Sequence, residues 1–314
     1  MDKQSDWISI APIRDLYHLP RELELPFEFG NRVCLERLPN WVLDESEDKV
    51  DLLLPRLRQE ADDFHVQYCL TARYEADALG TPDPEWEGSD ERPIQDSAID
   101  KIYIAALSLW LACPTAAGYA QVSHVERESD EPLVRQFHEF DRFRALKQYR
   151  RNRLRHEHML LARGYYSSIS DLPRTSTVFS AVGALGSALV QSMWHLRYLN
   201  LWLALECLFG PEDSREITYR ISQRIGMFLG RNRAEARNVF NRVKKSYGWR
   251  SKIVHGLRLS KLTPENSEIL IYRLEHTVRH SLIKILGDKP NIDNFNGKGR
   301  EKFLDDLVFT LSLA

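Results

Sequence analysis

The residues best suited to chemistry lie in one short segment of the C-terminal half. Residues 247–256 read Tyr-Gly-Trp-Arg-Ser-Lys-Ile-Val-His-Gly, with Arg250 and His255 five positions apart and Ser251 between them. A histidine has an ordinary pKa of about 6.5, so it can take or give a proton near neutral pH. An arginine stays charged and can hold two phosphate oxygens at once. Together the two side chains suit acid–base chemistry at a phosphate group.

The spacing alone does not single out this segment, because the same Arg-x4-His spacing occurs twice within residues 151–158. Two features favour the later segment. Residues 231–258 hold nine basic residues and one acid, and such a run attracts phosphate. We also expect Ile253 and Val254 to anchor the segment to a core, whereas residues 151–158 offer only Leu154.

A carboxylate in an apolar helix provides a partner for the arginine. Residues 202–209 read Trp-Leu-Ala-Leu-Glu-Cys-Leu-Phe, and a buried Glu206 without a donor would be costly. We therefore predict an ion pair between Glu206 and Arg250. On a helix, Ser251 and His255 are neighbours at i and i+4, with Tyr247 one turn earlier on the same side. Arg250 points about 140° away from His255 at 100° per residue, so it must bend back to reach a shared site.

The elements that must position these residues are helices. Apolar side chains recur at three- and four-residue intervals in each of several stretches after residue 184, with a shorter terminal helix near residues 303–311. The predicted helices cover residues 185–207, 217–228, 236–247 and 264–285. The first would bury Leu185, Leu189, Met193, Leu196, Leu199, Leu203 and Cys207. Short connections predict an antiparallel helical bundle over residues 185–314.

The N-terminal part has a different character. Residues 1–140 mix strand signals, such as 64–74, with a helix over 96–112, and predict an acidic α+β domain of unknown family. Residues 141–184 predict a basic helix over 141–164 and then a Ser/Gly-rich connection. The expected fold class is therefore an α+β domain followed by an all-α bundle.

The charge divides between the same two parts. Residues 1–140 hold 13 Lys and Arg against 29 Asp and Glu, a formal charge of −16, and residues 141–314 hold 30 against 16, or +14. This asymmetry fits a polyanionic partner for the basic half, and equally two domains that dock on each other. The four cysteines show no ligand-like pairing, and neither a secretory signal nor a membrane span is visible, so we expect a cytoplasmic protein.

Residues 250–256, after a basic helix, and Leu-Glu-Cys-Leu-Phe at 205–209 resemble the HEPN superfamily, most closely the Apea-like HEPN domains of bacterial anti-phage proteins. The resemblance covers roughly residues 185–287. The superfamily's Arg-x4-6-His motif falls on Arg250 and His255. Ser251 stands where Asn, Asp or His is commoner. The resemblance implies a homodimer in which two motifs face one cleft.

The resemblance further implies a metal-independent endoribonuclease without a cofactor, which cleaves RNA during abortive infection. Arg250 and His255 would be catalytic, with Ser251, Glu206 and Tyr247 in support. The acidic domain over residues 1–140 would sense a phage-derived trigger or restrain the nuclease. Basic residues near the motif would bind RNA, namely Lys244, Lys245, Lys252 and Arg258.

Other readings of these residues remain open. The alternative to the nuclease is a non-catalytic HEPN module that binds nucleotides or protein partners. His255 would then be a helix-end residue that compensates the helix dipole, and Glu206 would be structural. The basic helix over 141–163 is compatible with DNA binding. His276 and His280 stand at i and i+4, as metal ligands can, but no third ligand lies nearby in sequence.

Overall fold

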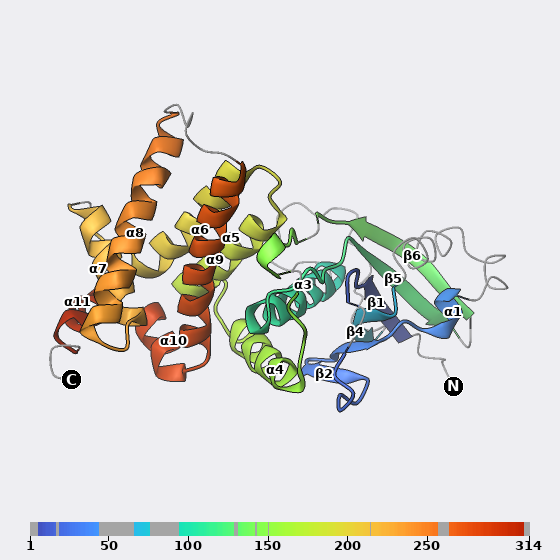
Figure 1. The fold of residues 1–314 in the computed structure, drawn as a ribbon. Coiled ribbons are helices and arrows are strands. Elements are labelled where there is room, and N and C mark those ends of the chain that lie inside the picture. The colour runs from blue at the N-terminus through green and yellow to red at the C-terminus, as the bar shows by residue number, and fades with distance from the viewer. Residues whose placement is uncertain are drawn as a thin grey trace, which may run out of the picture. The chain divides into compact units, whose positions relative to one another are not determined.

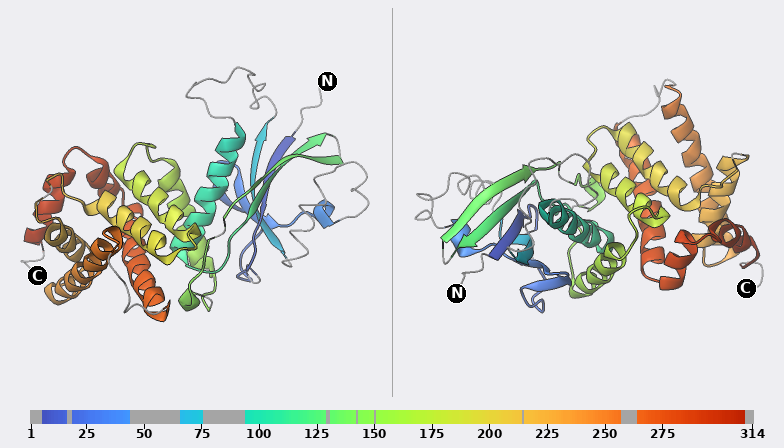
Figure 2. Two further views of the ribbon diagram at one scale, coloured as in Figure 1. Left: turned by 90° about the horizontal axis from the view of Figure 1, so that it is seen from above. Right: turned by 180° about the vertical axis from the view of Figure 1, so that it is seen from behind.

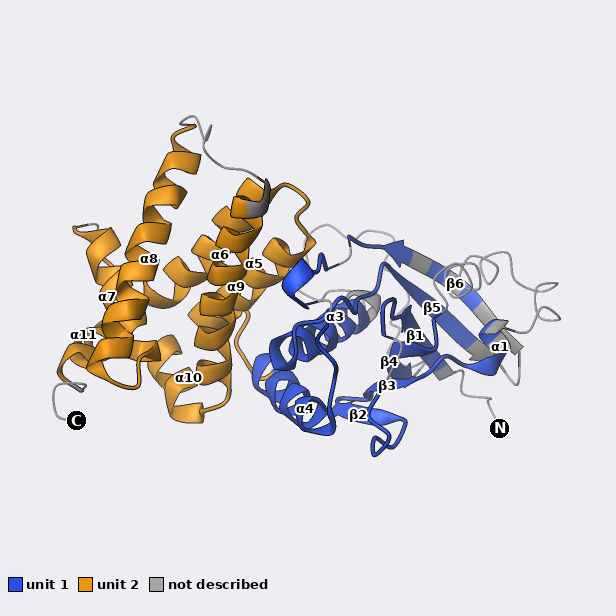
Figure 3. Cartoon of the chain, viewed as in Figure 1, with its two compact units in different colours: residues 1–170 blue, residues 171–314 orange. Residues whose placement is uncertain are grey.

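The structure is a computed structural model. It describes residues 6–16, 19–43, 66–75, 94–128, 131–141, 143–149, 151–213, 215–256 and 264–310. Two compact units divide the chain at residues 170 and 171 (Figure 3). An antiparallel sheet lies in unit 1 and the helices of unit 2 follow it, so the predicted order of an α+β part and a helical part is confirmed.

Unit 1 is built on an antiparallel sheet whose six described strands lie in the order β2-β3-β4-β1-β5-β6. The strand predicted over residues 64–74 and the helix predicted over residues 96–112 are found close to those bounds, as β4 (Tyr68–Glu75) and α3 (Ile94–Ala112). The strands are β1 (Asp6–Pro12), β2 (Phe27–Gly30), β3 (Val33–Arg37), β4 (Tyr68–Glu75), β5 (Gln121–Glu128) and β6 (Glu131–Glu139).

Each face of this sheet has its own cover, because side chains alternate along a strand. On one face Ile8, Ile10 and Val125 form a core with Val42 of the short helix α1 (Asn40–Leu43). On the other, α3 (Ile94–Ala112) packs on β1 and β4, and α4 (His156–Ser170) packs on α3 (Figure 2). Both layers lie within unit 1.

One buried polar cluster interrupts the apolar layers of unit 1. The Ser9 hydroxyl oxygen lies 2.7 Å from Nδ1 of His124, and the Tyr74 hydroxyl oxygen lies 3.3 Å from the same nitrogen. The His124 side chain has no exposed surface. Burial, with a smaller contribution from His138, lowers the pKa of His124 to about 4. This histidine is therefore neutral at pH 7.

The secondary-structure elements described in unit 2 are all helices (Figure 1). Neighbouring helices pack as α5 on α6, α7 on α8, α6 on α9 and α11 on α7. Of the described helices, none is long and apolar enough to cross a membrane. The helices are α5 (Thr177–Val190), α6 (Trp194–Phe209), α7 (Ile217–Leu229), α8 (Arg233–Val254), α9 (Pro264–Leu286), α10 (Lys289–Asn296) and α11 (Arg300–Thr310).

The stretch from 141 to 184 differs from its prediction. The predicted basic helix over 141–164 starts only at His156, and the described residues before it include just a 3-10 turn, Lys147–Tyr149. Helices α4 and α5 occupy most of the stretch predicted as a connection. These two helices form because apolar residues recur with helical spacing and are buried, as Tyr166 and Ile169 are in α4. Ser176, read as part of the connection, instead caps α5 by accepting a hydrogen bond from the Phe179 backbone N–H.

The helix predicted over 185–207 is also wrong, because α5 ends at Val190 and α6 begins at Trp194. At α6 the predicted inward face is the outward one, since Leu196 and Leu203 are 39% and 49% exposed, and Met193, just before the helix, is 55% exposed. The buried face carries larger aromatic side chains. Two of its residues form hydrogen bonds with other helices, Arg197 with α9 and Tyr198 with α8. Its residues are Arg197, Tyr198, Leu201, Trp202, Ala204, Leu205, Leu208 and Phe209.

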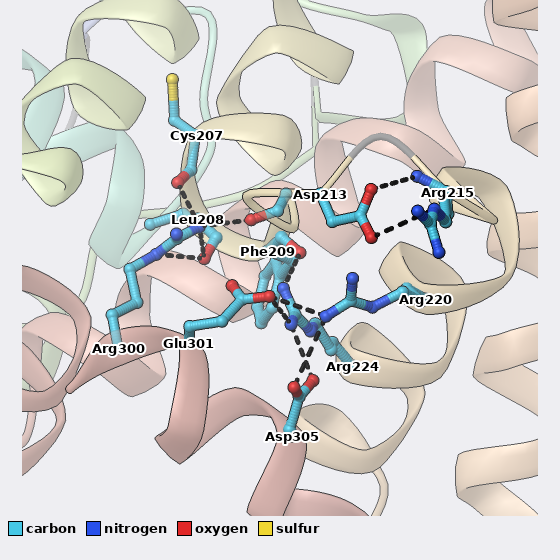
Figure 4. A network of polar contacts seen from close by, with 11 residues as sticks. Cys207, Leu208, Phe209, Asp213, Arg215, Arg220, Arg224, Arg300, Glu301 and Asp305 are labelled. Atoms are coloured by element: carbon cyan, nitrogen blue, oxygen red, sulfur yellow. Dashed lines mark hydrogen bonds and ion pairs between the residues drawn. The ribbon is translucent and has the colours of Figure 1, made fainter.

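A network of arginines and carboxylates fastens α11 to α7 (Figure 4). Nη2 of Arg224, whose side chain is 2% exposed, donates to Glu301 at 2.6 Å and to Asp305 at 2.7 Å. Nη2 of Arg220 donates to Glu301 at 2.7 Å. Burial favours the neutral acid, but the hydrogen bond and charge of Arg224 lower the pKa of Glu301 below its ordinary value. The network therefore has an architectural role.

The first residue of α11, Arg300, caps the C-terminal end of α6. Nη2 of Arg300 donates to the backbone carbonyls of Cys207, Leu208 and Gly210 at 2.8 to 3.0 Å (Figure 4). The last carbonyls of a helix have no partner within the helix, so a guanidinium there satisfies them. The C-terminal turn of α6, which carries Glu206, is thus held in place.

Candidate functional site

Helix α8 is held against α6 by contacts on successive turns. The Tyr198 hydroxyl donates to the backbone carbonyl of Ser246 at 2.9 Å. One turn further along α6, the Trp202 ring meets the Tyr247 ring edge-on with 5.1 Å between centroids. Tyr198 and Trp202 are both buried. The spacing of four residues along α6 places the next side chain of this face, residue 206, beside the end of α8.

The predicted ion pair between Glu206 and Arg250 forms at that place. Arg250 Nε lies 3.1 Å from Glu206 Oε1, and Arg250 Nη2 donates to Oε2 at 3.3 Å. The arginine also lies over Tyr247, with Cζ 5.4 Å from the ring centroid. Both partners of the pair stay partly open, at 28% exposure for the arginine and 26% for the glutamate. Because the pair occupies Nε and Nη2, the Nη1 amino group is left to bind an anion.

His255 ends α8. Its backbone N–H donates to the Ser251 carbonyl at 3.1 Å, and Gly256 follows in the left-handed conformation with φ of +60°. A glycine in this conformation is a common helix terminator. The His255 side chain is exposed and makes no hydrogen bond or ion pair with the residues that the structure describes. Its imidazole is therefore accessible from solvent.

The anchor predicted for this segment is wrong. Val254 is 50% exposed and Ile253 is only half-buried. Tyr247 and Arg250 fix the end of α8 in their place, through Trp202 and the ion pair described above. An edge-on pair of aromatic rings and a charge pair tie the helix to α6 where aliphatic burial was expected.

The structure brings some of the candidate residues together and leaves others apart. Arg250 contacts both Glu206 and Tyr247. Ser251 is half-buried and touches His255 through the backbone. Among described residues no contact joins the Arg250 and His255 side chains, as their angular separation on one helix predicts. A catalytic site that uses both the Arg250 and the His255 side chain therefore needs further groups beyond these two.

The predicted RNA-binding lysines lie on the surface of α8. Lys244, Lys245 and Lys252 are exposed, and Nζ of Lys252 lies 4.6 Å from the centroid of the Trp249 ring. Arg258 falls outside the described residues. The three lysines give the C-terminal half of α8 a cationic surface around the candidate pair.

A groove between α8 and α9, which the sequence reasoning missed, lies beside this surface. It has a volume of about 340 Å³. Its walls combine apolar and cationic side chains, including Trp249 and Arg242 from α8 and Ile269, Arg273 and Leu274 from α9. Positions 242, 245, 246 and 249 lie on one face of α8, and this periodic signal could have pointed to the groove.

The histidine pair on α9 forms no metal site that the structure supports. The rings of His276 and His280 stack with 3.9 Å between centroids. Within the described ranges, no group of three or more His, Cys, Asp or Glu residues is placed to hold a metal ion.

No family model, no curated protein and no solved structure matches the chain.

Proposed function

We propose that the chain is a metal-independent endoribonuclease of the HEPN type that acts as a homodimer in anti-phage defence by abortive infection. The observation that carries the proposal is the end of α8. There an accessible histidine follows, five residues on, an arginine that Glu206 and Tyr247 fix in direction. The cationic surface of α8 supports RNA as the substrate.

The chemistry requires three groups and no metal. A base removes the proton of the ribose 2′-OH, an acid protonates the leaving 5′-oxygen, and positive charge stabilises the phosphorane. His255 has the accessible imidazole for a proton transfer. Arg250 has Nη1 available for a phosphate oxygen, while Glu206 holds the rest of the guanidinium in place. The Tyr247 ring lies against the guanidinium and restricts its position.

Two copies of the site would supply the separate general acid and general base that the reaction needs. One histidine cannot be acid and base within a single concerted transfer. In a homodimer one His255 would act as the base and the other as the acid, across one phosphodiester. The separation of Arg250 and His255 within one chain fits this arrangement, because each scissile phosphate would then take its groups from both copies.

The test is cleavage of a labelled RNA in the presence of EDTA. We expect activity in the wild-type chain and its loss in Arg250→Ala and in His255→Ala. Arg237→Ala is the matched control on the same helix, since this exposed arginine lies away from the site. Equal activity in all variants would reject the enzyme and leave the binding module as the better account.

We further propose that the acidic N-terminal part restrains the nuclease until a phage-derived trigger relieves it. The charges of −16 and +14 in the two parts of the chain support this role. Removal of residues 1–140, the acidic part, is expected to raise the cleavage rate, provided circular dichroism shows that the helices of unit 2 persist. Faster cleavage by the full chain would contradict the restraint.

A further inference from the structure

The groove between α8 and α9 is unusual in the charges that it gathers. Arg242, Lys245 and Arg273 line it, and all three are exposed. None of them forms an ion pair with a residue in the described part of the chain. Three cations around one hollow repel one another, and an anion between them would relieve that repulsion. The groove is therefore electrostatically complementary to a negatively charged ligand.

The floor of the groove adds a second requirement. Val243, Leu270 and Leu274 lie in it with Ile269, which remains 40% exposed, and with the half-buried ring of Trp249. Apolar and aromatic surface of this kind gains free energy when a flat, weakly polar group covers it. A volume of about 340 Å³ suits one such group and not a folded segment.

A nucleotide combines these two properties, since it carries a flat base and a charged phosphate. In a double helix the bases are stacked on one another and only their edges can be reached, whereas an unpaired base can be splayed onto an aromatic ring. We propose that the α8/α9 groove takes an unpaired nucleotide of the RNA, which makes single-stranded RNA the substrate class of the site. This inference rests on the proposed function for its choice of RNA.

The location of the groove agrees with a strand that continues to the candidate site. Trp249 in the groove is followed directly by Arg250, which faces the scissile phosphate in the proposed mechanism. Arg242, at the far end, lies about 12 Å from Arg250 along the helix axis at 1.5 Å per residue. A base on Trp249 would therefore leave its own phosphate close to Arg250, and the neighbouring phosphates close to Arg242 and Arg273.

The experiment measures binding, so that it does not depend on cleavage. The full chain with His255→Ala is titrated against a fluorescent single-stranded RNA of twelve nucleotides, and against the same strand in a perfect duplex, with anisotropy as the readout. We expect the single strand to bind at least about tenfold more tightly than the duplex. Arg242→Gln, Arg273→Gln and Trp249→Leu should each weaken single-strand binding by about tenfold.

The matched control is Arg237→Gln, an exposed arginine on the same helix that points about 140° away from Arg242 at 100° per residue. It should leave the affinity unchanged. An equal loss in Arg237→Gln, or no loss in the groove variants, would overturn the proposal, as would equal binding of the duplex. If the groove variants instead separate a dimer in light scattering while RNA affinity holds, the groove belongs to a second copy and the proposal fails.

The same variants separate this inference from the proposed function. Loss of RNA affinity in the groove variants, together with no cleavage by any chain, would retain the groove and reject the nuclease. Cleavage that depends on Arg250 and His255 but is unchanged in the groove variants would retain the nuclease and reject the groove as a nucleotide site.

Discussion

Helix α6 carries two arginine–glutamate pairs that differ in their access to water. Arg197 of α6 donates from Nε to Glu275 of α9 at 2.6 Å, and the two side chains are 5% and 0% exposed. Glu206 of α6 meets Arg250 of α8 at 3.1 Å, and both are about one quarter exposed. The same two residue types thus form an enclosed pair on one side of the helix and an open pair on the other.

The difference in exposure separates two roles. An enclosed pair has given up its hydration, so removal of one partner leaves a buried charge without compensation. It fastens α9 to α6 and cannot receive a ligand. The open pair contributes little to stability because water screens it. Arg250 of this pair keeps a free amino group for an anion, and the role of the pair is to orient that arginine. Four predictions test this contrast.

The largest effect is expected when Glu275 is replaced by Gln. The substitution keeps the shape of the side chain but leaves the Arg197 charge buried, and should cost about 3 to 5 kcal/mol of unfolding free energy. Urea unfolding followed by circular dichroism measures it. A loss below about 1 kcal/mol would show that the enclosed pair is no more structural than the open one.

Arg250→Ala should affect cleavage more than stability. Loss of one preorganised charge at the phosphorane is expected to lower the cleavage rate by about 100- to 1,000-fold. The unfolding free energy should change by no more than about 1 kcal/mol, because the pair with Glu206 is open. Single-turnover cleavage and urea unfolding of the same sample give both values. Arg250→Lys keeps the charge but lacks the fork, and should recover only part of the rate.

A parallel contrast holds for the histidines. His255 is exposed, whereas His124 is enclosed and its pKa is lowered to about 4. The unfolded chain takes up this proton near pH 6.5 and the folded chain does not. The stability that His124 contributes is therefore complete above pH 6.5 and declines as the pH falls toward 4. We expect a loss of about 2 kcal/mol at pH 5 relative to pH 7.

His124→Gln is the control for this pH dependence, since an amide can hydrogen-bond to Ser9 without titrating. Urea unfolding at pH 7 and pH 5 should show a smaller pH difference in the variant than in the wild type. The same pH difference in both proteins would show that other groups cause it.

The smallest effect is expected for Glu206→Gln. An amide oxygen can still accept from Arg250, so the cost in stability should be about 0.5 to 1 kcal/mol. Cleavage should fall by less than in Arg250→Ala, because the arginine is present but less firmly oriented. A fall as large as that of Arg250→Ala would give the glutamate a direct part in the reaction.

Sequence periodicity predicted several elements well and failed at one informative place. Helices α7 and α9 are close to the predicted ranges 217–228 and 264–285. In α6 the same rule chose the wrong face, because leucines occur on both sides of the helix. Tyr198 and Trp202 turn inward since larger aromatic surface is buried there and the Tyr198 hydroxyl finds Ser246. Periodicity counts apolar residues, but it does not weigh their size or their partners.

The candidate site shows the same division. The pairing of Glu206 with Arg250 was predictable, because a carboxylate in an apolar helix needs a cation. The groove at Trp249 was not, because it depends on how far α9 stands from α8.

The sequence by itself determined that this chain has an acidic α+β part, a basic helical part and a charged pair between Glu206 and Arg250. Only the tertiary structure decided which face of α6 is buried, which pair is enclosed and where α8 and α9 leave a groove. The reason is physical: composition and spacing act locally along one element. Burial, by contrast, is set by several elements that meet from distant parts of the chain, and the free energy of each contact depends on the water that they exclude together.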